Sequence, residues 1–300
     1  MQRRIQTRKF FAGNGGIKMK KQDINIRDPF ILVKDGVYYL YGTRAANFGR
    51  NTAGFDVYKS TDLENWSEPI TVFDSSAYGL DREVNWAPEV HEYKGGYYMF
   101  ATFTKENGLR GTYILRSDSP EGPFAPHSDG AVTPFEWECL DGTFYVEDGV
   151  PYIVFCHEHT QIIDGTICYM PLTEDLRAAA GEPVLLFAGS EPFYVRKGPD
   201  VNHFVTDGPF MFRSKTGELF MIWSTFPKGL YAECVVKFEG GSIKNSFEHL
   251  DPLIDDDGGH GMIFRAGDKL YLTFHSPNVS GSERPFFVEI EDCGDNLKVK

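Results

Sequence analysis

A short phrase recurs five times along this chain of 300 residues, and it constrains the fold more than any other feature. Each copy opens with a small or polar residue next to Gly or Pro, and an apolar strand, a tight turn and an aromatic-rich strand follow. Successive copies lie 59, 54, 66 and 53 residues apart. Repeats of this length with several strands each are typical of blades arranged around a central channel. The copies start at Asp28, Ala87, Asp141, Asp207 and His260.

Each copy begins a predicted four-stranded sheet. In the first copy, residues 29–33, 37–43 and 56–59 predict three strands, and Asp35-Gly36 predicts the hairpin turn between the first two. Helical periodicity is nearly absent, apart from a turn at 175–180. We therefore predict an all-β fold, a five-bladed β-propeller with four antiparallel strands per blade, as a single domain over residues 23–300. The other predicted hairpin turns are Gly95-Gly96, Asp148-Gly149, Thr216-Gly217 and Gly267-Asp268.

Charge is divided unevenly along the chain. The net charge is −13, but residues 1–22 carry seven basic and no acidic side chains, so the remainder carries −20. Such an acidic body repels phosphate backbones, which argues against a nucleic-acid partner and favours a neutral substrate. We expect residues 1–22 to form a basic tail outside the propeller, disordered or foreign to the native protein.

The cysteines and the N-terminus bear on location. The five cysteines are odd in number and form no CxxC pair, a pattern that fits reduced thiols in a cytoplasm. Only three apolar residues, 10–12, follow the first basic cluster, which is too few for a signal peptide. No stretch is apolar and long enough to span a membrane. We expect a cytoplasmic protein without a membrane partner, and no pattern indicates its oligomeric state.

Three of the five phrases open with an aspartate: Asp28, Asp141 and Asp207. If each phrase begins the innermost strand of a blade, the three carboxylates converge at one mouth of the channel. Glycosidic bond cleavage requires such a group: one protonated acid, one ionised base, and a neighbour that raises the pKa of the acid by like-charge proximity. Each aspartate taken singly is also a common turn residue before Gly or Pro. Their shared register favours the catalytic interpretation.

The phrases together resemble glycoside hydrolase family 43, the five-bladed arabinanases, α-L-arabinofuranosidases and β-xylosidases, over about residues 24–292. The resemblance implies an inverting hydrolase of arabinose- or xylose-containing oligosaccharides, with exo-acting cleavage favoured. It implies that Asp28 is the general base, that Asp141 tunes and orients the acid, and that Asp207 occupies the acid position. The matching motifs are Arg27-Asp28-Pro29-Phe30, Trp86-Ala87-Pro88-Glu89-Val90, Leu140-Asp141-Gly142-Thr143-Phe144, Thr206-Asp207-Gly208-Pro209 and Gly259-His260-Gly261.

The acid position departs from the family pattern, which has Glu before Gly-Pro where this chain has Asp207. Aspartate is one methylene shorter, so either the backbone lies closer to the substrate or the acid lies elsewhere. Glu158, within His157-Glu158-His159, is the alternative acid.

Four further residues are candidates, and the same resemblance points to two of them, His260 and Arg284. His260 is expected near the channel axis, where a cation, often calcium held through water, would bind; no organic cofactor is implied. Histidine is a poor direct ligand for calcium, so water must supply most of the coordination. Trp86 and Phe30 are candidates to line the pocket as sugar-stacking surfaces, and Arg284 to bind sugar hydroxyls. Core packing for the aromatics and a surface ion pair for Arg284 are the alternatives.

Two other functions stay open at this point. Arg27-Asp28-Pro29 and Glu138-Cys139 are similar to motifs of the retaining, fructan-processing family 32, although their order along the chain differs from that family. A non-catalytic sugar-binding propeller is the third interpretation, because the acid position is unusual. Hydrolysis of arabinosides or xylosides, hydrolysis of fructans, or binding without turnover would separate the three.

Overall fold

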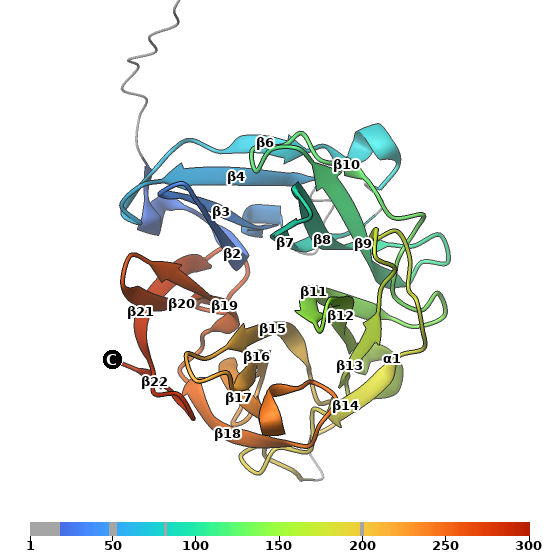
Figure 1. The fold of residues 1–300 in the computed structure, drawn as a ribbon, viewed down its shortest axis with the longest axis vertical. Coiled ribbons are helices and arrows are strands. Elements are labelled where there is room, and N and C mark those ends of the chain that lie inside the picture. The colour runs from blue at the N-terminus through green and yellow to red at the C-terminus, as the bar shows by residue number, and fades with distance from the viewer. Residues whose placement is uncertain (1–18, 48–52, 81–82, 199–200) are drawn as a thin grey trace, which may run out of the picture.

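The computed structural model describes residues 19–47, 53–80, 83–198 and 201–300. Five antiparallel sheets stand around a central axis like the blades of a propeller (Figure 1). The innermost strands are β2 (Ile26–Lys34), β7 (Asn85–Tyr93), β11 (Cys139–Glu147), β15 (Asp207–Arg213) and β19 (Gly259–Ala266). Each of them begins with one copy of the repeated phrase. The predicted five-bladed β-propeller is therefore confirmed.

Four of the sheets have four strands in sequence order, as predicted. The second blade continues outward with β8 (Gly96–Thr104), β9 (Arg110–Ser117) and β10 (Ala125–Pro126). The third continues with β12 (Val150–His157), β13 (Thr166–Pro171) and β14 (Val184–Ala188). The fourth continues with β16 (Leu219–Thr225), β17 (Ala232–Phe238) and β18 (Phe247–Ile254). The fifth continues with β20 (Lys269–Ser276), β21 (Arg284–Asp292) and β22 (Leu297–Val299).

The first blade is more elaborate. Beyond β3 (Val37–Arg44) and β4 (Phe55–Ser60), two short strands, β5 (Asn65–Trp66) and β6 (Ile70–Phe73), share the place of the fourth strand. A further strand, β1 (Met19–Lys20), pairs with β5. Residues 19–22 thus belong to the blade, and the predicted boundary after residue 22 is too late. The rest of the predicted tail, residues 1–18, lies outside the described residues.

Helices are few and short. The α-helix α1 (His159–Ile162) follows β12, and four 3₁₀ turns lie at Lys21–Asp23, Ala45–Asn47, Ser75–Tyr78 and Glu239–Gly241. None of the helices in the described part of the chain is long and apolar enough to cross a membrane. The described cysteines are all free thiols, as expected.

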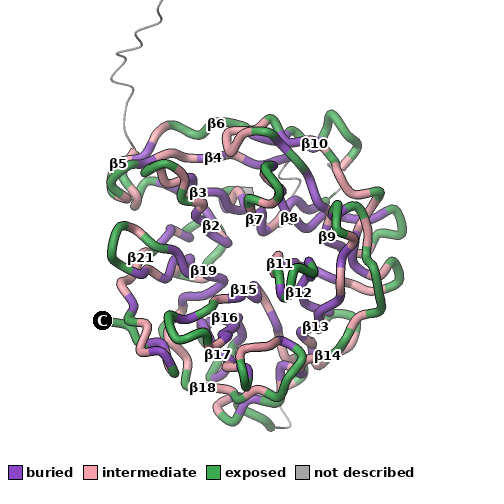
Figure 2. Tube along the Cα trace, viewed as in Figure 1, coloured by how far each residue is buried: buried purple, intermediate pink, exposed green. Residues whose placement is uncertain are grey.

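The hairpins explain why the strands start and stop where they do. Asp35 and Gly36 both have positive φ, 51° and 77°, the geometry that a two-residue turn needs to match strand twist. The second hairpin turns one residue earlier than predicted, since Gly96 already pairs with Tyr93 as the first residue of β8. The inner and middle strands are mostly buried and the outer loops exposed (Figure 2).

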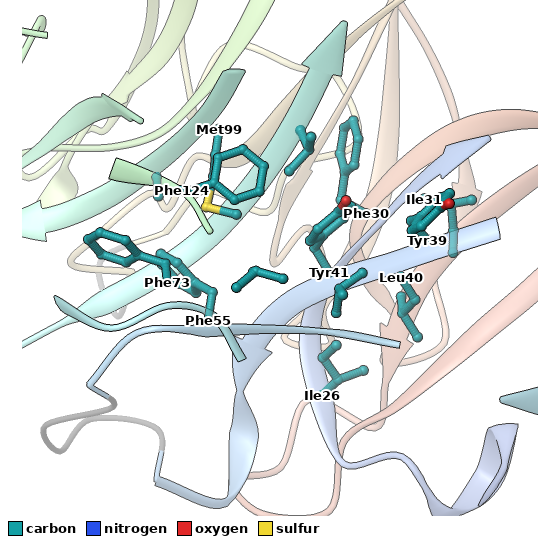
Figure 3. Close-up of a cluster of buried hydrophobic side chains, with 14 of the residues drawn as sticks. Ile26, Phe30, Ile31, Tyr39, Leu40, Tyr41, Phe55, Phe73, Met99 and Phe124 are labelled. Carbon is teal, nitrogen blue, oxygen red and sulfur yellow. The ribbon is translucent and has the colours of Figure 1, made fainter. Parts of the chain in front are cut away.

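Hydrophobic side chains fill the space between blades and also close the channel. Figure 3 shows one such cluster, in which Phe30 lies with Tyr41 and Leu40. Phe30 of the first blade also meets Phe210 of the fourth, with ring centroids 6.2 Å apart. These blades are not neighbours in the ring, so the two rings meet across the axis. They form an apolar floor beneath the channel mouth.

Within the described residues, the first and last blades exchange no strand where the ring closes. The buried Glu283, just before β21, accepts an ion-pair bond from Arg27 at 2.8 Å. The backbone carbonyl of Glu283 also accepts from the N–H of Ile26 at 3.4 Å. Closure of the ring therefore depends on contacts at this seam between the first and last blades, and Arg27 makes one of these contacts.

Candidate active site

Each inner strand carries a β-bulge near its start. Strand register slips there in all five blades, and the bulged residue has a φ near +50°. For any residue but glycine this backbone region is strained, and bulges of this kind aim a side chain away from the regular pleat. The bulged residues are Asp28, Ala87, Asp141, Gly208 and His260.

The bulges correct the predicted register of the three aspartates. Asp207 pairs with Ser224, as Arg27 pairs with Thr43, so Asp207 precedes its bulge and Gly208 occupies the position of Asp28. The expectation of one shared register was therefore wrong for the fourth blade. The sequence does show this offset when the two phrases are aligned on proline: Gly208-Pro209 then matches Asp28-Pro29, and Asp207 falls one position earlier.

Bulged residues are bonded to the blade before them in a repeating way. At four of the five junctions, their backbone N–H donates to the side chain at one fixed position on the preceding blade's second strand. Ala87 donates to Thr43 at 2.8 Å and Asp141 to Thr102 at 3.0 Å. His260 donates to Ser224 at 2.7 Å, and Asp28 donates to His275 at 3.2 Å. The fifth junction differs: the position holds Cys156, and the N–H of Gly208 donates to Asp141 Oδ2 instead.

A cavity of about 230 Å³ opens at this end of the channel. Six of the residues singled out in the sequence line it together: Asp28, Asp141, Asp207, Glu158, Trp86 and His260. The remaining lining residues are Arg27, Arg110, Leu140, His159, Val205, Phe226 and Asn278. The convergence expected from the repeats is thus present, although one carboxylate reaches the cavity from a different backbone position.

Asp28 lies among cations. Its Oδ1 is 3.2 Å from Nδ1 of His260, and its Oδ2 accepts a 2.5 Å hydrogen bond from the hydroxyl of Thr43. Burial alone would raise the pKa of Asp28, but the charges of His260 and Arg27 lower it below the ordinary aspartate value. Asp28 is therefore held ionised, as a general base must be.

Asp141 and Asp207 respond in the opposite direction. Burial is the main reason that the pKa of Asp207 rises to about 6, and the nearby carboxylate of Glu158 adds to the rise. Burial likewise raises the pKa of Asp141, and the repulsion between these two carboxylates adds to it. The pair therefore keeps a proton at pH values where isolated aspartates are ionised. A single cavity thus holds one ionised carboxylate, Asp28, and a pair of carboxyl groups, Asp141 and Asp207, that retains a proton.

Glu158, the alternative acid, is committed to other partners. Its Oε2 accepts from Arg110 at 2.9 Å, and its Oε1 accepts from the backbone N–H of His159 at 2.9 Å. Both oxygens act as acceptors, so a transferable proton on Glu158 would break one of these bonds. Arg110 also bonds Glu138, and its guanidinium carbon lies 5.2 Å from the ring centroid of Trp86. Trp86 thus lines the cavity with Arg110 packed on its ring.

Two predicted binding residues lie elsewhere. Phe30 is 5% exposed and packs in the core cluster, below rather than in the cavity. Its position follows the bulge and points to the channel axis, where Phe210 meets it. Arg284 donates to the backbone carbonyls of Gln22 and Glu283, both at 2.8 Å. Arg284 therefore braces the seam between the first and last blades, and neither residue lines the cavity.

His260 lies at the axis end of the cavity but has little character of a metal ligand. Burial alone would lower its pKa, but the surrounding carboxylates, Asp28 first, raise it to about 9. Among the described residues no group of three or more His, Cys, Asp or Glu side chains has the geometry to hold a metal ion. We assign no step to a metal; the predicted calcium stays a prediction, tested by chelation and calcium re-addition.

Sequence reasoning missed the residues that hold the carboxylates. Tyr231 donates to Asp207 Oδ2 at 3.0 Å, and Arg110 pairs with Glu158. His275 accepts from the N–H of Asp28. These residues lie outside the repeated phrase, on outer strands or in loops, and the contacts of Arg110 and His275 reach across to the neighbouring blade. The recurring position of Thr43, Thr102, Ser224 and His275 lies one or two residues before the end of each second strand.

Known structures share this fold. The chain is 38% identical to the endo-arabinase from Bacteroides thetaiotaomicron VPI-5482, covering 91% of this chain and 96% of that one with a TM-score of 0.81. A thermostable family-43 glycoside hydrolase is 23% identical, with coverage of 97% and 96% and a TM-score of 0.79. The α-L-arabinofuranosidase from Lactobacillus brevis is 17% identical, with coverage of 94% and 99% and a TM-score of 0.71. The last two, at this identity, show the fold alone.

The sequence itself carries the family assignment. No curated protein sequence matches this chain. Residues 23–286, however, match the profile of the glycosyl hydrolases family 43, from the residues just before the first bulged strand to the outer half of the fifth blade. The match covers all five repeated phrases, and the fructan-processing alternative is not favoured. The protein is a glycoside hydrolase and belongs to family 43.

Proposed function

We propose that this enzyme hydrolyses arabinan-type oligosaccharides with inversion, using Asp28 as general base and Asp207 as general acid. One observation carries the proposal: a single cavity contains a carboxylate with a lowered pKa and another with a raised pKa. Environments that push the pKa values of two carboxyl groups apart assign the base and the acid. The cavity, about 230 Å³, is small enough to suit a short stretch of sugar.

The mechanism follows from these protonation states. Asp207 donates its proton to the glycosidic oxygen as the bond to the anomeric carbon breaks. Asp28 takes a proton from a water molecule that attacks the opposite face of the sugar, which inverts the configuration. Asp141 lies near both Asp28 and Asp207, with His260 next to it: Nδ1 of His260 is 3.7 Å from Asp141 Oδ2. Repulsion between the carboxylates of Asp141 and Asp207 makes this pair retain a proton, which is available when the leaving oxygen approaches.

The substrate class rests on the 38% identical relative, which is described as an endo-arabinase. The neighbour described as an endo-1,4-beta-xylanase is 20% identical and supports only the fold. Arabinose-containing chains are therefore favoured over xylose-containing ones. The relative's description also favours internal cleavage over the exo-acting cleavage expected from the sequence.

The assignment of the acid is tested with leaving groups. Asp207→Asn should slow hydrolysis of arabino-oligosaccharides by roughly 10²–10⁴-fold, while a nitrophenyl α-L-arabinofuranoside, which scarcely needs a proton, should lose much less. Glu158→Gln should show no such difference between the two substrates. The reverse pattern would move the acid to Glu158.

Stereochemistry and products complete the test. Proton NMR of the first turnover should show the anomer opposite to that of the substrate, and retention would overturn the inverting mechanism. Chromatography of linear arabinan digests should show mixed oligomers for internal cleavage, and a single small product for exo cleavage. Xylo-oligosaccharides in a parallel assay test the substrate class: faster hydrolysis of xylan than of arabinan would overturn it.

A further inference from the structure

Asp207 is held by a tyrosine from the same blade. Tyr231, in the loop between β16 and β17, is 1% exposed, and its hydroxyl donates to Asp207 Oδ2 at 3.0 Å. A neutral carboxyl group has one oxygen that carries the proton and one that accepts. Because Oδ2 already accepts from Tyr231, the proton of Asp207 belongs on Oδ1.

Asp28 is held in a comparable way by a histidine of the fifth blade. His275, at the end of β20, is fully buried, and its Nδ1 accepts the backbone N–H of Asp28 at 3.2 Å. Nε2 of the same ring lies 3.3 Å from Asn278 Oδ1, which can only accept. This network assigns the neutral tautomer with its proton on Nε2. Burial lowers the pKa of His275 to about 3, so this acceptor persists across the working pH range.

The two holders touch each other. The rings of Tyr231 and His275 are stacked, with centroids 5.5 Å apart and an interplanar angle of 29°. A continuous buried line therefore runs from Asp207 through Tyr231 and His275 to the backbone of Asp28. Stacked rings packed in a buried site have little freedom to slide, since interiors are close-packed. In an inverting glycosidase the two carboxyl groups must keep a separation that admits one water.

We propose that Tyr231 and His275 act as positioning residues, a buried strut that sets the spacing between Asp28 and Asp207 and presents Oδ1 of Asp207 to the leaving oxygen. This inference rests on the proposed roles of Asp28 and Asp207. In this arrangement Tyr231 positions the acid, Asp207, and His275 positions the base, Asp28. The stacking of the two rings couples their effects.

Removal of the tyrosine hydroxyl should alter the titration of the acid. The groups that face Asp207 are Glu158, His260, Asp28, Asp141 and the Tyr231 hydroxyl. The hydroxyl stabilises the ionised form, so Tyr231→Phe should raise the pKa of Asp207. The acid must be protonated to work, and the alkaline limb of kcat/KM should therefore move to higher pH by roughly 0.5–1 unit. Substrates with poor leaving groups should lose about tenfold in kcat with little change in KM.

The experiment compares Tyr231→Phe with Tyr41→Phe. Tyr41, in the first blade, is equally buried, and its hydroxyl donates to the carbonyl of Pro120 in the second blade, outside the cavity. Both variants lose one buried hydrogen bond, and both should show a lower Tm. Only Tyr231→Phe should shift the alkaline limb and discriminate between leaving groups. If its pH profile and leaving-group dependence match those of Tyr41→Phe, the strut is overturned.

His275→Asn gives a second, independent arm. Its amide oxygen can still accept from Asp28, but the stacked ring is gone, so the base should be misplaced. We expect a loss on all substrates alike, without leaving-group dependence, and a loss in the double variant smaller than the product of the single losses. Leaving-group dependence in His275→Asn, or independent effects in the double variant, would overturn the strut. Absence of any glycoside hydrolysis, or an Asp207→Asn variant without leaving-group dependence, would instead overturn the proposed function itself.

Discussion

The backbone N–H of Gly208 donates to Oδ2 of Asp141 at 3.2 Å, which ties the third blade's carboxylate to the strand that carries Asp207. At the other four junctions a side chain of a second strand accepts this bond, but here that position holds Cys156. Asp141 therefore has two functions: it links two blades, and it acts electrostatically on the acid next to that link.

These two functions separate in different Asp141 variants. Asp141→Asn keeps an oxygen that can accept from Gly208 but removes the carboxyl group that titrates together with Asp207, so the alkaline limb of kcat/KM should move to lower pH, toward the pKa of about 6 of Asp207. Asp141→Ala also leaves the Gly208 N–H without its partner, which costs about 1–3 kcal/mol. Thermal melting should therefore rank Ala below Asn. Equal melting temperatures would contradict the linking function.

Asp28→Asn should abolish turnover on every substrate. The amide cannot take a proton from water, and an activated leaving group cannot compensate for a missing base. We expect a loss of roughly 10²–10⁴-fold or more in kcat for arabino-oligosaccharides and nitrophenyl glycosides alike. Asp35→Asn, in the exposed hairpin turn of the same blade, is the matched control and should keep full activity. Substantial nitrophenyl glycoside hydrolysis by Asp28→Asn would exclude it as the base.

The pH dependence should be bell-shaped and skewed toward acid. Asp28 must be ionised, and its lowered pKa places the acidic limb below about pH 4. Asp207 must be protonated, and its raised pKa makes activity fall as pH rises through about 6. Because Asp141 and Asp207 titrate as a pair, the alkaline limb should extend toward pH 8, the value to which the pKa of Asp141 is raised. Initial rates from pH 3 to 9 at low substrate check this; full activity at pH 9 would contradict it.

Trp86→Ala should weaken substrate binding more than chemistry. The indole lines the cavity, and Arg110 packs on its ring. Loss of this apolar surface should raise KM roughly tenfold or more, with a smaller effect on kcat. Trp86→Phe should fall between Ala and the wild type, since it keeps an aromatic face. A change in stability with unchanged KM would assign Trp86 to core packing.

Arg284→Ala should lower stability and leave substrate binding unchanged. The side chain bonds two backbone carbonyls at the seam between the first and last blades. We expect a loss of about 1–2 kcal/mol in the free energy of unfolding, measured by urea titration, and an unchanged KM. Arg116→Ala, which removes an exposed pair with Asp118, should change stability much less. A raised KM in Arg284→Ala would restore the sugar-binding role inferred from the sequence.

The repeats made the blades predictable because each hairpin is local. Asp35-Gly36 and its counterparts specify turns within a few residues, so strand positions follow from short stretches of sequence. The expected convergence of Asp28 and Asp141 succeeded for the same reason: both are bulged residues of their inner strands. Asp207 lies one position before the bulged residue of its strand. An alignment of the repeats on their aspartates hides this offset.

Reasoning from the repeats could not predict the partners of these carboxylates. Tyr231, His275 and Arg110 meet the site from a loop and from second and third strands, and the contacts of His275 and Arg110 exist only when neighbouring blades are docked. Phe30 was misplaced for a similar reason. Its apolar character fits a stacking surface and a core residue equally well, and only the ring geometry shows that it faces Phe210 below the cavity.

The absence of strand exchange at the seam has a consequence for how the chain reaches its native state. Apart from the pairing of β1 with β5 and of β4 with β6 in the first blade, backbone pairing joins consecutive strands, so the blades close mostly short loops at low entropic cost. The contact between the parts of the described chain that lie farthest apart in sequence is the docking of the fifth blade on the first, through Glu283 with Ile26 and Arg27. During synthesis we expect blades to assemble one after another, with the catalytic cavity completed last, when residue 283 has left the ribosome.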